Sequence, residues 1–117
     1  MSAVRIYHNP RCSKSRQALE LLEQQGAEVD VVLYLETPPD VATLSELLLT
    51  LGMSARELMR KGEAPYKELA LDNPDLSEAQ LVQAMVDYPK LIERPIAVKD
   101  GKAVIGRPPE KVLELIS

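Results

Sequence analysis

Hydrophobic and polar positions change their period along this chain, and each change predicts an element. Residues 3–8 alternate in the manner of a short strand. Residues 11–25 place apolar side chains three and four positions apart, as one face of a helix requires, and Gly26 follows as a stop signal. Residues 29–34 are rich in β-branched side chains and predict a second strand. We therefore expect a strand–helix–strand unit whose two strands are parallel.

The middle of the chain has the spacing and the capping residues of helices. Asp40 is a typical N-cap residue, and Ser54 and Ser77 each begin a capping-box pattern. Pro89 ends the last of these helices. We expect a helical block over residues 41–89. The expected inward-facing residues are Val41, Leu44, Leu47, Leu48 and Leu51 in its first helix and Leu81, Val82 and Met85 in its last.

The C-terminal part predicts a hairpin and a final helix. Residues 96–98 and 103–105 resemble strands, and the Asp100-Gly101 pair between them is a strong signal of a tight turn. A last helix is expected to start at Pro108-Pro109, with Val112, Leu113 and Ile116 facing inward. With the helical block counted as an insertion around a crossover helix, this is the thioredoxin arrangement. We expect one α/β domain over residues 1–117: a mixed four-stranded sheet with flanking helices and that insertion, its strand order left open.

Composition limits the functional class. The 117 residues include 14 Lys+Arg and 18 Asp+Glu, a net charge of −4, which disfavours broad nucleic-acid binding. No apolar stretch approaches the ~20 residues of a membrane span, and the N-terminus lacks a signal-peptide core. We expect a soluble cytoplasmic protein that binds neither nucleic acid nor membrane.

Cys12 is the first candidate for chemistry. It is the only cysteine, which rules out an intrachain disulfide and a cysteine-based zinc cluster. A lone cysteine is often just a small buried hydrophobe, but this one lies near a helix N-terminus, where the dipole favours a thiolate. Arg11, Lys14 and Arg16 add positive charge around it and are candidates for an oxyanion pocket. His8, at the end of the first strand, adds either a charge or a hydrogen bond.

Ser15 stands where a Cys-X-X-Cys motif has its second thiol. The chain therefore cannot close its own disulfide, and redox work by Cys12 needs a thiol from glutathione or a partner protein. One histidine and one cysteine are too few for a typical metal site, so we expect no metal and no bound cofactor.

Two arginines have unusual settings next to proline. Arg94 precedes Pro95 at the entry to the third strand, and Arg107 lies between Gly106 and a proline. In thioredoxin-like domains the proline at this strand entry is cis and lies beside the cysteine, so Arg94 is expected near Cys12. Guanidinium groups bind tetrahedral oxyanions through paired N–H donors. The combination suggests a thiolate that attacks an oxyanion.

Several segments together resemble one family. Residues 7–16 are similar to the active-site segment of the glutaredoxin-linked arsenate reductases, the ArsC family, and in particular to its shorter branch. Residues 34–39 resemble a second block of that family. Arg60, Arg94 and Arg107, each within its own short motif, match arginines that the family uses to bind substrate. The resemblance extends over nearly the whole chain.

The resemblance implies a mechanism for arsenic detoxification. Cys12 would attack arsenate as a thiolate and form a covalent adduct, which glutathione as co-substrate and then glutaredoxin would resolve. Arg60, Arg94 and Arg107 would hold the oxyanion and act as catalytic residues with Cys12. His8 and Ser15 match positions that support the thiolate.

Two other functions remain open. A thiol reductase of the same fold would act on glutathione mixed disulfides and would not need three converging arginines. A Spx-like regulator would bind RNA polymerase without catalysis, but members of that family commonly carry a two-cysteine switch, whose second cysteine is Ser15 here.

Overall fold

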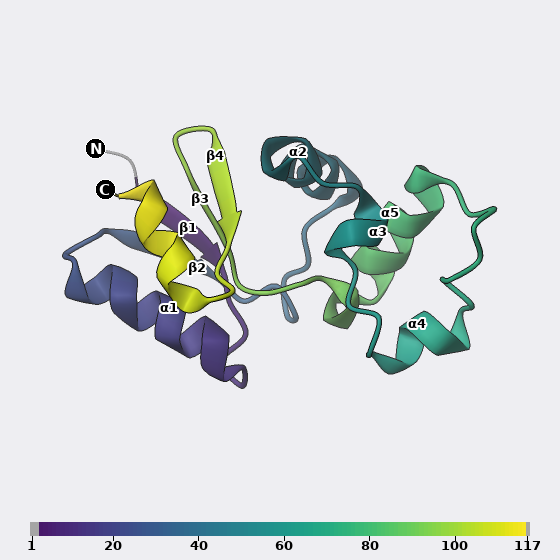
Figure 1. The fold of residues 1–117 in the computed structure, drawn as a ribbon, viewed down its shortest axis with the longest axis horizontal. Coiled ribbons are helices and arrows are strands. Elements are labelled where there is room, and N and C mark those ends of the chain that lie inside the picture. The colour runs from purple at the N-terminus through teal and green to yellow at the C-terminus, as the bar shows by residue number, and fades with distance from the viewer. Residues whose placement is uncertain (1–2, 117) are drawn as a thin grey trace. The chain divides into compact units, whose positions relative to one another are not determined.

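The computed structural model describes residues 3–116, which divide into two compact units (Figure 1). The chain leaves the first unit after Thr37 and returns to it after Glu93. We call residues 3–37 with 94–116 the sheet unit and residues 38–93 the helical unit. A single domain with a helical insertion bounded at 41 and 89 stays a prediction.

A mixed four-stranded sheet of order β2-β1-β3-β4 forms the sheet unit. β1 (Val4–Tyr7) pairs in parallel with β2 (Val29–Val32), as the strand–helix–strand pattern predicts. β3 (Ile96–Lys99) runs antiparallel to β1, and β4 (Lys102–Ile105) runs antiparallel to β3. The predicted mixed sheet is confirmed, and β1 and β3 occupy its two central positions.

The hairpin turn follows its sequence signal, whereas β2 is shorter than predicted. Asp100 and Gly101 both have positive φ, at 51° and 77°, as the twist of a two-residue hairpin favours. β2 ends at Val32 because the chain turns, with the Thr37 N–H donating to the Leu33 carbonyl at 2.9 Å. The residues after β2 therefore leave the sheet.

Two helical segments cover one face of the sheet and build its core. Figure 1 shows α1 (Ser13–Gln24) beside η2 (Pro109–Leu115), and the two segments are in contact. The last helix differs from the prediction in type: it is a 3₁₀ helix. Over seven residues a spacing of 3.0 residues per turn cannot be distinguished from the 3.6 of an α-helix. Its Val112 is fully buried, while Leu113 and Ile116 are only half-buried. The core consists of Val4, Ile6, Ala18, Leu22, Ala97 and Val112.

The helical unit starts its helices where the capping residues predict. It contains α2 (Val41–Leu51), α3 (Ala55–Leu58), α4 (Ala64–Glu68), α5 (Glu78–Asp87) and η1 (Pro89–Leu91). The Asp40 carboxylate accepts the Thr43 N–H at 2.8 Å, and both capping boxes, at Ser54 and Ser77, are formed. Local side-chain acceptors thus fix three of these helix starts.

The inward face of α2 is narrower than predicted. Leu44, Leu47 and Leu48 are buried, as are the three predicted residues of α5. The prediction for Val41 is wrong because this residue occupies the first turn of α2 and remains 43% exposed. Leu51, in the last turn, is half-buried. No helix within residues 3–116 is long and apolar enough to cross a membrane.

α4 was not predicted, because none of its residues is buried and its apolar positions therefore show no helical period. It ends in a Schellman arrangement, with the Leu71 N–H donating to the Tyr66 carbonyl at 2.9 Å and the Ala70 N–H donating to the Lys67 carbonyl at 3.1 Å. Ala70 takes the left-handed position there, with φ of 52°, where glycine is the usual residue.

Candidate active site

Cys12 is the N-cap residue of α1, immediately after the loop that leaves β1. Its backbone is extended, with φ −94° and ψ 121°, and its carbonyl accepts the Arg16 N–H at 3.0 Å to begin the helix. The Cys12 N–H donates to the Asn9 carbonyl at 3.0 Å, which holds the loop closed. The thiol is half-buried and lies where the first N–H groups of the helix have no partners within the helix.

The surroundings of Cys12 favour its thiolate. Burial of the thiol raises its pKa, but the backbone N–H of Ser15 and the Arg94 guanidinium lower it, together with the positive charge of Arg94 and the N–H of Lys14. The net result is a pKa below the usual value of a cysteine. At any given pH a larger fraction of Cys12 is therefore thiolate than of an ordinary cysteine, which favours its action as a nucleophile.

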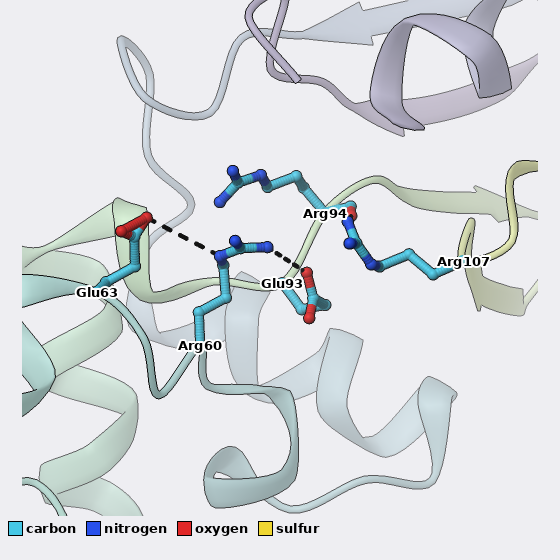
Figure 2. Close-up of polar contacts among 5 residues, drawn as sticks. All are labelled: Arg60, Glu63, Glu93, Arg94 and Arg107. Atoms are coloured by element: carbon cyan, nitrogen blue, oxygen red, sulfur yellow. Dashed lines mark hydrogen bonds and ion pairs between the residues drawn. The ribbon is translucent and has the colours of Figure 1, made fainter. Parts of the chain in front are cut away.

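Arg94 reaches the thiol from the entry to β3, as the predicted arrangement requires. The Arg94–Pro95 peptide bond is cis, and so is the Arg107–Pro108 bond, which was not predicted. The Arg107 Nη1 group donates to the Arg94 carbonyl at 3.2 Å, and Figure 2 shows the Arg107 side chain extended toward Arg94. The sheet unit thus brings Cys12, Arg94 and Arg107 into one hydrogen-bonded neighbourhood.

Gly106 keeps this neighbourhood tightly packed. Its N–H donates to the Pro95 carbonyl at 2.8 Å, so the two segments lie against each other. A Cβ atom at this position would lie 2.8 Å from Pro95 Cγ and 3.1 Å from Val112 Cγ1. Only glycine therefore fits beside Pro95 without moving its neighbours.

His8 and Ser15 form a buried pair beneath the loop. His8 Nδ1 lies 2.6 Å from Ser15 Oγ, and the same hydroxyl oxygen accepts the Asn9 N–H at 3.0 Å. Burial lowers the pKa of His8, the charge of Arg16 lowers it further, and Glu23 opposes this shift. His8 is therefore neutral at pH 7, and of its two expected contributions the hydrogen bond is the one present.

The basic residues of the loop are exposed. The guanidinium of Arg16 donates to the Pro10 carbonyl at 2.9 Å, and the Arg11 and Lys14 side chains face solvent. Their part in an oxyanion pocket stays a prediction. Sequence reasoning missed Asn9, whose side-chain oxygen accepts the Arg11 N–H at 3.0 Å. An asparagine directly after a strand is a typical signal of such a turn.

Arg60 lies in the helical unit and is held by two carboxylates. Figure 2 shows its side chain between Glu63 and Glu93. Arg60 Nη1 donates to Glu93 Oε1 at 2.7 Å, and its Nε atom lies 3.9 Å from Glu63 Oε1. Sequence reasoning missed both glutamates. The Glu93 contact spans 33 positions and leaves no local pattern, and Glu63, three positions from Arg60, follows it in a segment that is not helical. The role of Arg60 in binding an oxyanion stays a prediction.

Within residues 3–116, no three His, Cys, Asp or Glu side chains gather in a way that would hold a metal ion. The groups at this site that can take part in chemistry are the Cys12 thiol and the positively charged side chains near it. A thiolate beside an arginine can attack an electrophile that carries negative charge, while the guanidinium binds that charge.

Comparisons with known proteins identify close relatives. The ArsC family profile matches residues 7–115. A protein of Escherichia coli K12, called uncharacterized protein YfgD, is 67% identical over 114 residues, covering 97% of this chain and 96% of its own length. An arsenate reductase of Neisseria meningitidis serogroup A is 51% identical over 113 residues, covering 96% and 97%.

The same fold occurs in a solved arsenate reductase from Vibrio cholerae. It superposes with a TM-score of 0.94 at 54% identity, over 97% of each chain. The mixed sheet with flanking helices is therefore the thioredoxin-like fold that the order of elements predicted.

Proposed function

The chain belongs to the ArsC family, and on this premise we propose that it is an arsenate reductase that uses glutathione and glutaredoxin. One observation carries the proposal: the only thiol of the chain lies at a helix N-terminus against Arg94, with a lowered pKa. Such a site matches the chemistry of a tetrahedral oxyanion that must be bound and then attacked.

In the first step the Cys12 thiolate attacks the arsenic atom of arsenate. An S–As bond forms, one As–O bond breaks, and the departing oxygen leaves as water after taking up protons from solvent. Arsenic stays in its +5 state. The helix N–H groups and Arg94, which stabilise the thiolate before attack, then face the negative oxygens of the adduct.

In the second step the glutathione thiolate attacks the Cys12 sulfur. An S–S bond forms, the S–As bond breaks, and its electron pair stays on arsenic, which leaves as arsenite in the +3 state. Each of the two sulfurs has given one electron. A glutaredoxin thiolate then attacks the glutathione sulfur of the mixed disulfide and releases Cys12. Ser15 cannot take that role, because its hydroxyl forms no disulfide.

The arginines divide the work of binding. Arg94 contacts the nucleophile, and Arg107 reaches the backbone of Arg94. The part of Arg60 rests on its match to the family's substrate-binding arginine. His8 and Ser15 hold the loop around Cys12 through their hydrogen bond and through the Asn9 N–H.

A coupled assay tests the proposal. It combines the purified protein with arsenate, glutathione, glutaredoxin, glutathione reductase and NADPH. We expect NADPH consumption that requires arsenate and disappears in Cys12→Ser, a local change that preserves the fold. Retention of activity in Cys12→Ser would rule out the thiolate mechanism.

The same assay separates the alternatives. Turnover of a glutathione mixed disulfide without any arsenate-dependent turnover would support the thiol reductase. No turnover of either arsenate or the mixed disulfide, together with retention of RNA polymerase in a separate pull-down, would support the regulator.

A further inference from the structure

Two carboxylates hold the Arg60 guanidinium, and neither belongs to the residues that the proposed mechanism uses. The Glu93 contact, at 2.7 Å, has the length of a charge-assisted hydrogen bond. The Glu63 contact, at 3.9 Å, is an ion pair beyond hydrogen-bond length. Arg60 and Glu93 are only 25% and 28% exposed, so this pair is better shielded from water than a surface ion pair.

Backbone pairing builds the Arg60–Glu93 contact into the helical unit. The Arg60 N–H donates to the Leu91 carbonyl at 2.7 Å, and the Glu93 N–H donates to the Leu58 carbonyl at 3.1 Å. These bonds pair the two segments in antiparallel fashion, with Arg60 opposite Leu91. Arg60 and Glu93 are then diagonal neighbours on one face of the pair, a relation that long side chains can bridge. The contact is thus set by the fold and not by a chance meeting of mobile side chains.

We propose that Glu93 is a positioning residue that orients the Arg60 guanidinium for oxyanion binding. This inference rests on the proposed function, because Arg60 needs an oxyanion to bind. Arginine has five N–H donors, and the Glu93 contact uses one of them on Nη1. The remaining donors are held in a fixed direction, so less rotamer freedom is lost when an anion binds. Glu63 gives weaker support from the Nε side.

Glutamine at position 93 tests the role of the carboxylate at nearly constant shape. We expect Glu93→Gln to raise the arsenate KM about threefold to tenfold, with a smaller change in kcat, because the charged guanidinium then bonds to a neutral acceptor and no longer to a carboxylate. Glu93→Asp keeps the charge and should recover part of the loss. Glu63→Gln should change KM less than twofold, since its ion pair is longer. Glu46→Gln, the same change at an exposed position of α2, is the matched control.

A double-mutant cycle with Arg60→Ala separates positioning from a structural role. If Glu93 acts through Arg60, then Glu93→Gln should not raise the KM further in the Arg60→Ala background. An equal rise of KM in both backgrounds would overturn the inference, and so would an unchanged or lower KM in Glu93→Gln when the unaltered chain turns over arsenate.

Nitrogen-15 NMR of the Arg60 Nε–H group gives a readout that needs no turnover. Its signal is assigned by its absence from Arg60→Ala. We expect a high order parameter in the unaltered chain and a clear fall in Glu93→Gln. Unchanged order in Glu93→Gln would overturn the inference by itself. If the unaltered chain fails to reduce arsenate, the proposed function falls, while a loss of order in Glu93→Gln would still establish that Glu93 holds Arg60.

Discussion

Replacing Arg94 by alanine should raise the pKa of the Cys12 thiol. In the folded chain burial raises this pKa, and the Ser15 N–H, the Arg94 guanidinium and the Lys14 N–H together lower it below its usual value. Arg94→Ala removes the only side-chain donor among these groups and leaves the two backbone donors in place. The thiolate therefore loses part of its stabilisation and keeps the rest.

The size of the effect follows from the contact that is lost. A hydrogen bond to a charged group contributes about 1.5–3 kcal/mol, and 1.36 kcal/mol corresponds to a change of 1 in pKa. Because Cys12 is half-buried, solvent takes over part of that contribution. We expect the pKa to rise by about 1, which lowers the thiolate fraction about tenfold wherever the pH lies well below the pKa.

The assay is the rate of alkylation by iodoacetamide between pH 5 and 10, followed by the mass of the intact protein. With a single cysteine in the chain, the fast first addition reports on Cys12, and slower alkylation of amines at high pH is measured in Cys12→Ser. Arg94→Lys keeps the charge but loses the planar guanidinium. The Cys12 pKa in this variant should therefore lie between that of the unaltered chain and that of Arg94→Ala. Arg11→Ala, an exposed residue of the same loop, is the control. An Arg94→Ala pKa equal to that of the unaltered chain would refute the assignment of Arg94 to the thiolate.

Three further predictions concern stability. Ala70→Gly should raise the free energy of unfolding by about 1 kcal/mol, measured with urea, because Ala70 has φ of 52° and glycine accepts this conformation without strain; a loss of stability would contradict the Schellman assignment. Gly106→Ala should lower the free energy of unfolding by about 1–3 kcal/mol and raise the Cys12 pKa, since the new Cβ would lie 2.8 Å from Pro95 Cγ. Stability should also fall as the pH drops below about 6.5. In the unfolded chain His8 then binds a proton, whereas in the folded chain, where its pKa is lowered, it binds that proton only at a lower pH. Urea unfolding from pH 8 to 5 checks this slope, and its persistence in His8→Gln would assign it to another group.

The elements that the sequence predicts well are those with local causes. Asp40 caps α2 because its own carboxylate reaches an N–H three positions ahead, and the two capping boxes work at the same short range. The Asp100-Gly101 turn needs only the ease with which these residues take positive φ. Cys12 is predicted at a helix N-terminus because the change from strand to helix occurs just before it.

The features that escaped prediction depend on long-range pairing or on missing burial. The strand order β2-β1-β3-β4 requires β1 to pair with a segment about 90 residues later, and no local pattern carries that information. α4 buries none of its side chains, so its apolar residues have no reason to keep a helical period. The sequence does not decide the protonation state of His8 either, because that state depends on burial and on the charge of Arg16 rather than on the position of His8 in the sequence.

The neutral His8 changes how the thiolate of Cys12 is explained. A charged imidazole near the sulfur would lower the cysteine pKa directly, as in a Cys–His pair. Here the Ser15 hydroxyl accepts the Asn9 N–H and contacts Nδ1 of a neutral ring, so this pair shapes the loop and supplies no charge. The positive charge comes instead from Arg94, which is far from Cys12 in the sequence. Arg94 lies near Cys12 because β3, which begins just after it, pairs with β1. Since an arginine stays charged over the whole physiological range, the nucleophile does not depend on the protonation of a histidine. The rate of Cys12 alkylation should therefore rise with pH as the Cys12 thiol ionises, without requiring a protonated His8.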